Sequence, residues 1–171
     1  MPKTTSTAEE KLHVAAAWRS VLARYFNSYR LAAYVLVFYA LGHTLGAVIA
    51  TPQFGTESDS VVSMMKSVHV IAQGSDATWY GFFRGFGWFI TVFFVFSIVF
   101  AWFVGGKSGD FRVQLAPVTW SLFVSYVAGA VIAWKYLFMM PTLFAVAVAA
   151  LFGIGCIRDW LGSGVIQRQA S

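Results

Sequence analysis

The chain has 171 residues, of which 58% are hydrophobic and only 11% are charged, and its mean hydropathy is +0.68. These values exclude an ordinary water-soluble domain and predict an integral membrane protein with a single helical domain. The formal net charge of +5 does not indicate a nucleic-acid partner, because the basic residues are spread along the flanks of apolar segments.

The first 30 residues precede the first long apolar run. Met1 to Glu10 are polar, and from Lys11 to Arg30 apolar residues recur at helical spacing between basic ones. This pattern predicts an interfacial helix on the cytoplasmic surface of the membrane. An amino-terminal extension of the first membrane helix explains the same pattern equally well.

Four apolar runs have the length of about 20 residues that a helix needs to cross a membrane. They are residues 31–50, 85–104, 116–134 and 137–157, and they form one membrane domain (31–157) followed by a tail at 158–171. The predicted fold class is therefore an all-α bundle of four transmembrane helices. Almost no residues separate the third run from the fourth, so we expect these two to form a tight antiparallel hairpin.

The basic residues are distributed unequally between the two sides of these spans. One side holds only Lys66, Arg84 and Lys135, and the other holds nine, which predicts a multi-pass protein of the bacterial inner membrane with both termini in the cytoplasm. The nine are Lys3, Lys11, Arg19, Arg24, Arg30, Lys107, Arg112, Arg158 and Arg168.

The first connection, from Thr51 to Tyr80, has about 30 residues, which is more than a passive loop usually has. Ser58 or Asp59 is suited to cap a helix, and apolar residues from Val61 to Ala72 then share one face up to a break at Gly74. We therefore expect an amphipathic helix in this extracytoplasmic connection.

Two pairs of glycines four residues apart, Gly42 with Gly46 and Gly81 with Gly85, predict notches where helices pack closely. Both pairs lie near the extracytoplasmic ends of the first two spans, so we expect them to meet and to bring His43 close to Arg84. The polar residues that this places in one candidate ligand site are His43, Thr44, His69, Asp76, Trp79, Tyr80 and Arg84.

Three functions fit these residues. The first is binding of a lipid, isoprenoid or quinone-like ligand, in which Arg84 meets an anionic or carbonyl headgroup and His43 donates a hydrogen bond from deeper in the membrane. The second is an accessory or scaffold subunit, or a homo-oligomer, without a ligand. For that case His43 would make a structural hydrogen bond to a neighbouring helix.

The third function is a redox protein that holds haem or copper through His43 and His69, with help from methionine thioethers. Haem in a helical membrane domain prefers histidines on two facing spans, and only His43 lies within a span. We assign no metal ligand, no cofactor and no catalytic residue from the sequence. The methionines in question are Met64, Met65, Met139 and Met140.

Two segments, Gly42-His43-Thr44-Leu45-Gly46 and Trp79-Tyr80-Gly81-Phe82-Phe83-Arg84-Gly85-Phe86-Gly87, resemble small bacterial four-helix membrane proteins that are loosely similar in layout to the DoxX-like group. The resemblance covers about the first 105 residues by motif and the rest by hydropathy alone. It implies a fold and no reaction. Such relatives carry an acidic residue after the aromatic pair, where this chain has Gly81.

Overall fold

The computed structural model of the chain describes residues 11–14, 16, 18, 25–50 and 55–169, with side chains described as far as Ser163. Lys11 to Val14 are helical. Arg19 and Arg24 of that predicted helix lie outside the described residues.

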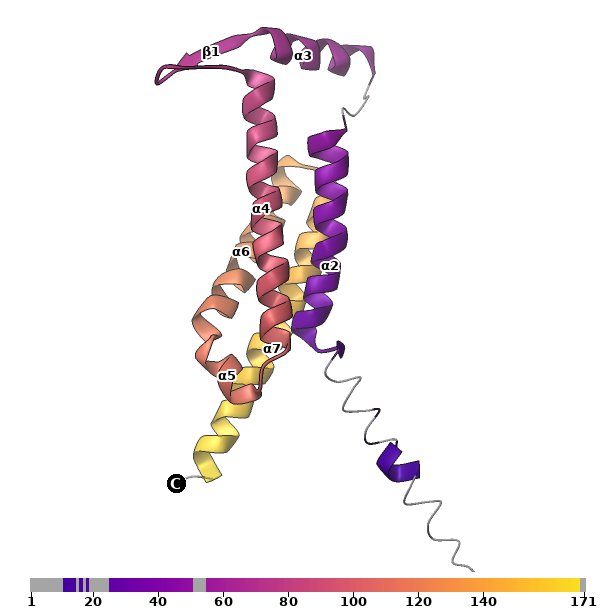
Figure 1. The fold of residues 1–171 in the computed structure, drawn as a ribbon, viewed down its shortest axis with the longest axis vertical. Helices are drawn as coiled ribbons and strands as arrows, with labels where there is room; N and C mark the ends of the chain where they lie inside the picture. The colour runs from indigo at the N-terminus through magenta and orange to yellow at the C-terminus, as the bar shows by residue number, and fades with distance from the viewer. Residues whose placement is uncertain (1–10, 15, 17, 19–24, 51–54, 170–171) are drawn as a thin grey trace, which may run out of the picture. The chain divides into compact units, whose positions relative to one another are not determined.

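Among the described residues, four helices are long and apolar enough to cross a membrane, which confirms the predicted all-α class with four spans (Figure 1). One boundary differs from its prediction: α4 begins at Trp79, within the segment predicted as the first connection, rather than at residue 85. Another differs because α7 continues beyond residue 157. The four are α2 (Ser28–His43) with its π-helical continuation η1 (Thr44–Ile49), α4 (Trp79–Gly105), α6 (Ala116–Tyr136) and α7 (Met139–Gln169).

The connections contain shorter elements. The first holds α3 (Thr56–Ser67) and two antiparallel strands, β1 (His69–Ala72) and β2 (Ser75–Thr78). The second holds the short helix α5 (Gly109–Gln114). Only Leu137 and Phe138 separate α6 from α7, and these helices pack against each other as the predicted antiparallel hairpin.

The prediction that one helix continues to Gly74 is wrong, because α3 ends at Ser67 and a β-hairpin follows. Gln73 (φ 52°) and Gly74 (φ 79°) both have left-handed backbones. Two such residues in succession match the twist of paired strands in a two-residue hairpin turn. Gly74 is therefore the turn of a hairpin and not the end of a helix, and His69 lies on a strand.

The chain divides into two compact units, which are described separately. Unit 1 comprises Met1–Val35 and Val99–Ser171, and unit 2 comprises Leu36–Ile98. Unit 1 contains α5, α6, α7, the first turns of α2 and the end of α4. Unit 2 contains the rest of α2 and α4, together with η1, α3 and the hairpin.

The core of unit 1 is aromatic where α2 meets the α6–α7 hairpin. Tyr126 stacks on Phe152, with ring centroids 6.0 Å apart, and Tyr29 meets the same ring edge-on at 6.1 Å. The approach of α2 is close because Gly155 has no side chain. A Cβ at Gly155 would lie 2.6 Å from Cζ of Tyr29, which is too short for any ordinary contact.

Candidate functional site

His43 ends α2 and forms a hydrogen bond between two helices of unit 2. Its Nε2 lies 3.0 Å from the carbonyl oxygen of Gly87 on α4, and it must donate, because a carbonyl only accepts. The imidazole also meets the Phe94 ring edge-on at 5.5 Å. These contacts are those of a histidine that joins two membrane helices.

Thr44 extends the same network of hydrogen bonds. The Thr91 hydroxyl donates to the Gly87 carbonyl at 3.2 Å, so the Thr44 hydroxyl, 3.0 Å from that of Thr91, donates to Thr91. The Gly87 oxygen therefore accepts from both His43 and Thr91. His43 and Thr44, both assigned to the candidate ligand site, thus donate their hydrogen bonds to α4.

The close approach in unit 2 occurs at Gly87 rather than at the predicted glycine pairs. A Cβ at Gly87 would lie 2.8 Å from Cγ2 of Val48, which is 1% exposed. At Gly42, Gly46 and Gly85, by contrast, a Cβ would meet no described atom within 4 Å, apart from the helix's own backbone. A Cβ at Gly81 would meet only the Thr78 hydroxyl, at 3.3 Å. The predicted packing of these four glycines against a second helix of this chain is therefore wrong.

His69 and Asp76, both assigned to the candidate site, do come together, through the hairpin. His69 is paired with Thr78 and Asp76 with Ile71, so the two side chains are diagonal neighbours across the strands. His69 Nδ1 lies 2.7 Å from Asp76 Oδ1, and the side chains are 58% and 63% exposed. The carboxylate orients the imidazole through Nδ1.

Two cations lie close to the Tyr80 ring. Nζ of Lys66, from α3, is 4.9 Å from the ring centroid, and Cζ of Arg84, from the next turn of α4, is 5.9 Å away. Both distances are typical of attraction between a cation and an aromatic face. Within the described part of the chain, no carboxylate lies within ion-pair distance of either cation, since the ion pairs there are His69–Asp76 and Arg112–Asp159.

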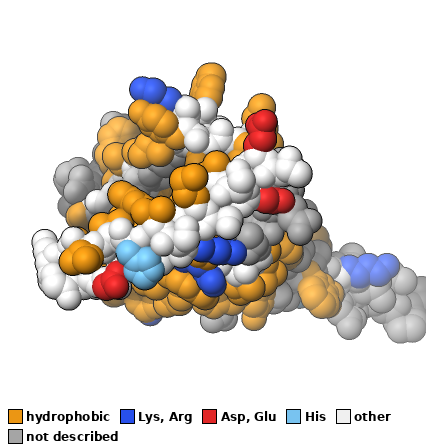
Figure 2. All heavy atoms as spheres, turned by 90° about the horizontal axis from the view of Figure 1, so that it is seen from above, with side chains coloured by type: hydrophobic (Ala, Val, Ile, Leu, Met, Phe, Trp, Pro, Cys, Tyr) orange, Lys and Arg blue, Asp and Glu red, His pale blue; other side chains and the backbone are white. Residues whose placement is uncertain are grey.

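Exposed apolar side chains lie on the same elements as Lys66, Tyr80 and Arg84. No residue of α3 is buried, and the exposed side chains include large hydrophobic ones on α3, on the hairpin and at the start of α4. Figure 2 looks onto the face that carries α3 and the hairpin, where charged and apolar side chains lie next to one another. The exposed apolar residues are Val61, Met64, Val68, Ile71 and Trp79.

Unit 1 holds a polar cluster that the sequence did not predict. Asp159 on α7 accepts from Nε of Arg112 at 2.8 Å through one carboxylate oxygen and from the Tyr29 hydroxyl at 2.9 Å through the other. Nη1 of Arg112 donates to the Lys107 carbonyl at 2.7 Å. The only hint in the sequence was a lone carboxylate at the end of the fourth apolar run.

Among the described residues, no group of three or more His, Cys, Asp or Glu side chains is placed to hold a metal ion. The comparisons add no relative: no family model, no curated protein and no solved structure matches the chain.

Proposed function

We propose that this protein binds an anionic lipid through its first connection, with Lys66, Tyr80 and Arg84 contacting the headgroup. The observation that carries the proposal is the position of two cations against one tyrosine ring, with no carboxylate within ion-pair distance among the described residues. A phosphate oxygen between the cations would supply the missing charge, and the tyrosine hydroxyl is a further donor.

The nearby acidic residues do not cancel this charge. Asp76 is paired with His69. Glu57 and Asp59 lie in the first turn of α3, whereas Lys66 lies in its last turn. Glu57 and Asp59 precede Lys66 by nine and seven positions, which on a helix is about 13 Å and about 10 Å along the axis. Both separations exceed the screening length of about 8 Å in physiological salt. Lys66 and Arg84 therefore leave an excess of positive charge around Tyr80 even when Asp76 is counted as one negative charge.

The exposed hydrophobic side chains favour a lipid over a soluble anion. A helix with no buried residue and several exposed apolar ones gains free energy when it lies at the boundary between headgroups and acyl chains. Trp79, which is 53% exposed, is of the residue type that settles at this depth. The acyl chains would contact these apolar residues while the cations hold the headgroup.

Compared with the site predicted from the sequence, this proposal moves the headgroup contact away from His43 and Thr44. Those two residues support the site by fixing η1 to α4 through the Gly87 carbonyl. An isoprenoid phosphate carries the same anionic group as a phospholipid. A quinone is neutral and offers no negative charge to pair with the two cations. The redox alternative has no metal-binding cluster among the described residues to favour it.

The test is native mass spectrometry of the purified full-length protein with phosphatidylglycerol and with phosphatidylcholine of the same acyl chains. Two cations, each worth about 1 kcal/mol near an anionic surface, predict that the double variant Lys66→Ala with Arg84→Ala loses roughly tenfold or more of its affinity for phosphatidylglycerol. The matched control is Lys135→Ala, because Lys135 also lies over a tyrosine ring, that of Tyr136. Equal losses in both variants, or no preference for the anionic lipid, would reject the proposal and favour a scaffold subunit.

We also propose that the protein resides in the bacterial inner membrane with both termini in the cytoplasm, which puts the first connection on the outer surface. The unequal distribution of Lys and Arg supports this orientation. Alkaline phosphatase fused within α3 should be active, and the same enzyme fused after residue 171 should be inactive. The reverse pattern would place the lipid site in the cytoplasmic leaflet.

A further inference from the structure

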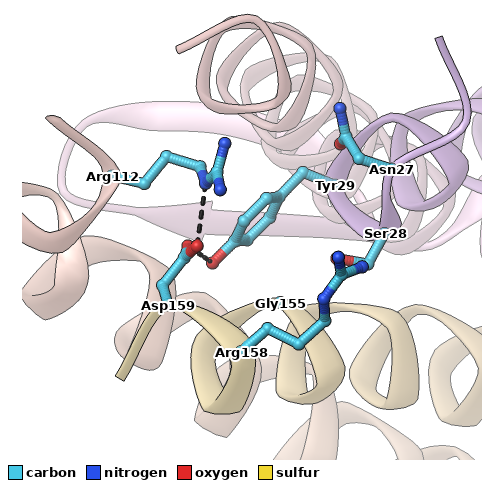
Figure 3. Close-up of a pocket in the computed structure, with 7 residues that line it drawn as sticks. All are labelled: Asn27, Ser28, Tyr29, Arg112, Gly155, Arg158 and Asp159. Atoms are coloured by element: carbon cyan, nitrogen blue, oxygen red, sulfur yellow. Dashed lines mark hydrogen bonds and ion pairs between the residues drawn. The ribbon is translucent and has the colours of Figure 1, made fainter. Parts of the chain in front are cut away.

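Unit 1 contains a small cavity between the amino end of α2, α5 and α7 (Figure 3). Its volume is about 40 Å³. A single water needs at least about 10 to 15 Å³ on the same measure, so the cavity has room for roughly three or four oxygen-sized groups. The residues that line it are Asn27, Ser28, Tyr29, Arg112, Gly155, Arg158 and Asp159.

The lining has two guanidinium groups and one carboxylate, and the carboxylate is already engaged. Both oxygens of Asp159 accept hydrogen bonds from the protein, one from Arg112 and one from Tyr29. Arg112 spends Nε and Nη1 on Asp159 and on the Lys107 carbonyl, and its Nη2 has no bond to a described residue. The carboxylate therefore holds Arg112 in place without using all of its donors.

Arg158 is the second cation. It lies one residue before Asp159 on α7 and points toward Ser28 in Figure 3. No carboxylate among the described residues lies within ion-pair distance of it. One positive charge of the lining therefore stays uncompensated.

Ser28 adds a hydroxyl group to the lining. The residue is only 8% exposed and lines the cavity. It is also the first residue of α2, a helix of 16 residues, whose first-turn amide groups lack partners within the helix. Asn27 caps one of them, since its Oδ1 accepts from the amide of Arg30 at 3.1 Å. The remaining amides favour an anion at this end.

We propose that this cavity binds a phosphate group, with Arg158, the free nitrogen of Arg112 and the Ser28 hydroxyl as donors. Guanidinium groups, a hydroxyl and a helix amino end are together the donor set that binds phosphate oxygens in proteins. The group is either free phosphate or the headgroup of a phospholipid. The site belongs to unit 1 and does not depend on the lipid site proposed for Lys66 and Arg84.

The experiment measures thermal unfolding of the full chain in phospholipid-free detergent, titrated with sodium phosphate or with phosphatidic acid. Sodium chloride at equal ionic strength is the control. A ligand that binds only the folded state raises the unfolding midpoint. Replacing Arg158 with glutamine should weaken the apparent Kd roughly tenfold or more, as expected for loss of one charge-assisted hydrogen bond. Because Arg158 has no ion pair in the described structure, Arg158→Gln should unfold at the wild-type midpoint without the anion.

Lys107→Gln is the matched variant, because Lys107 is a cation in unit 1 that lies over the Phe103 ring and does not line the cavity. It should bind like the wild type, and so should the double variant at Lys66 and Arg84, which separates this proposal from the previous one. Ser28→Ala is a second test variant and should also bind more weakly. Stabilisation by phosphate itself identifies a free anion site, and stabilisation by phosphatidic acid alone identifies a headgroup site. No stabilisation by either, or equal loss in Arg158→Gln and Lys107→Gln, overturns the proposal.

Discussion

Asn27 and Gly105 lie 78 positions apart in sequence, and Nδ2 of Asn27 donates to the Gly105 carbonyl oxygen at 2.7 Å. The same amide caps α2, because its Oδ1 accepts from the backbone amide of Arg30. One side chain therefore satisfies a donor at the start of α2 and an acceptor at the end of α4. Gly105 permits this approach, since a Cβ there would lie 2.9 Å from Oδ1 of Asn27.

Asn27→Ala should destabilise the protein by about 1 to 3 kcal/mol, because it removes a helix cap and a hydrogen bond to a carbonyl. Asn27→Asp keeps the capping oxygen and loses the donor, so its cost should fall between those of the wild type and the alanine variant. Reversible unfolding in mixed micelles, followed by circular dichroism, measures both. An alanine variant as stable as the wild type would contradict the double role.

The close approach at Gly87 predicts a difference between two glycines of α4. Gly87→Ala forces a methyl group against Val48 and should cost about 1 to 3 kcal/mol, as overpacking does. Gly85→Ala meets no described atom and should change the free energy of unfolding by less than about 0.5 kcal/mol. The same unfolding measurement applies. A larger loss of stability in Gly85→Ala than in Gly87→Ala would instead support the close helix packing at Gly85 that the sequence predicted.

His43→Ala should cost about 1 kcal/mol, the order measured for hydrogen bonds between membrane helices, because the Gly87 carbonyl loses a donor. His43→Gln still carries an N–H donor and should recover part of that loss. Affinity for phosphatidylglycerol should be unchanged in both, since we place His43 outside the headgroup contact. A loss of lipid affinity with unchanged stability would return His43 to the ligand site.

The two ion pairs should differ in strength. Asp159 is 10% exposed and Arg112 26%, so Asp159→Asn leaves a largely buried cation without its partner, which costs about 3 kcal/mol. Asp76→Asn breaks the exposed pair with His69. Exposed ion pairs contribute roughly 0 to 1 kcal/mol to the free energy of unfolding. A double-mutant cycle of Asp159→Asn with Arg112→Gln isolates the buried interaction. Equal costs for the two asparagine variants would contradict these roles.

Hydropathy and loop length were enough to predict the four spans and the tight connection between α6 and α7. Both depend on local composition, which a single sequence displays directly. The hairpin escaped prediction because Val68, His69 and Ala72 continue the helical spacing of α3. The helix ends at Ser67, and the left-handed residues Gln73 and Gly74 form the turn of the hairpin. In the sequence, a lone glycine after a periodic run is an equally good helix terminus.

In the two sites, contacts between residues close in sequence could be predicted, whereas contacts between distant residues could not. The approach of His69 to Asp76, and of Arg84 to Tyr80, occurs within a few residues, and the sequence placed all four in one region. The contacts of Asp159 join it to residues 47 and 130 positions away, and no local pattern specifies such partners. Glycine spacing likewise identifies a helix face but not the neighbour that it meets.

The π-helix η1 inserts the equivalent of one extra residue into the end of the first span, as the bond from the Ala50 amide to the Leu45 carbonyl, five residues back, records. In this wider turn, residues five apart lie above one another, so His43 and Val48 both face Gly87. In an α-helix with 3.6 residues per turn the same two side chains would diverge by about 140°. Changing this turn into a regular α-helix of the same length would therefore cost the chain either its hydrogen bond or its packing at Gly87. The π-helical conformation of the turn is thus required for both contacts.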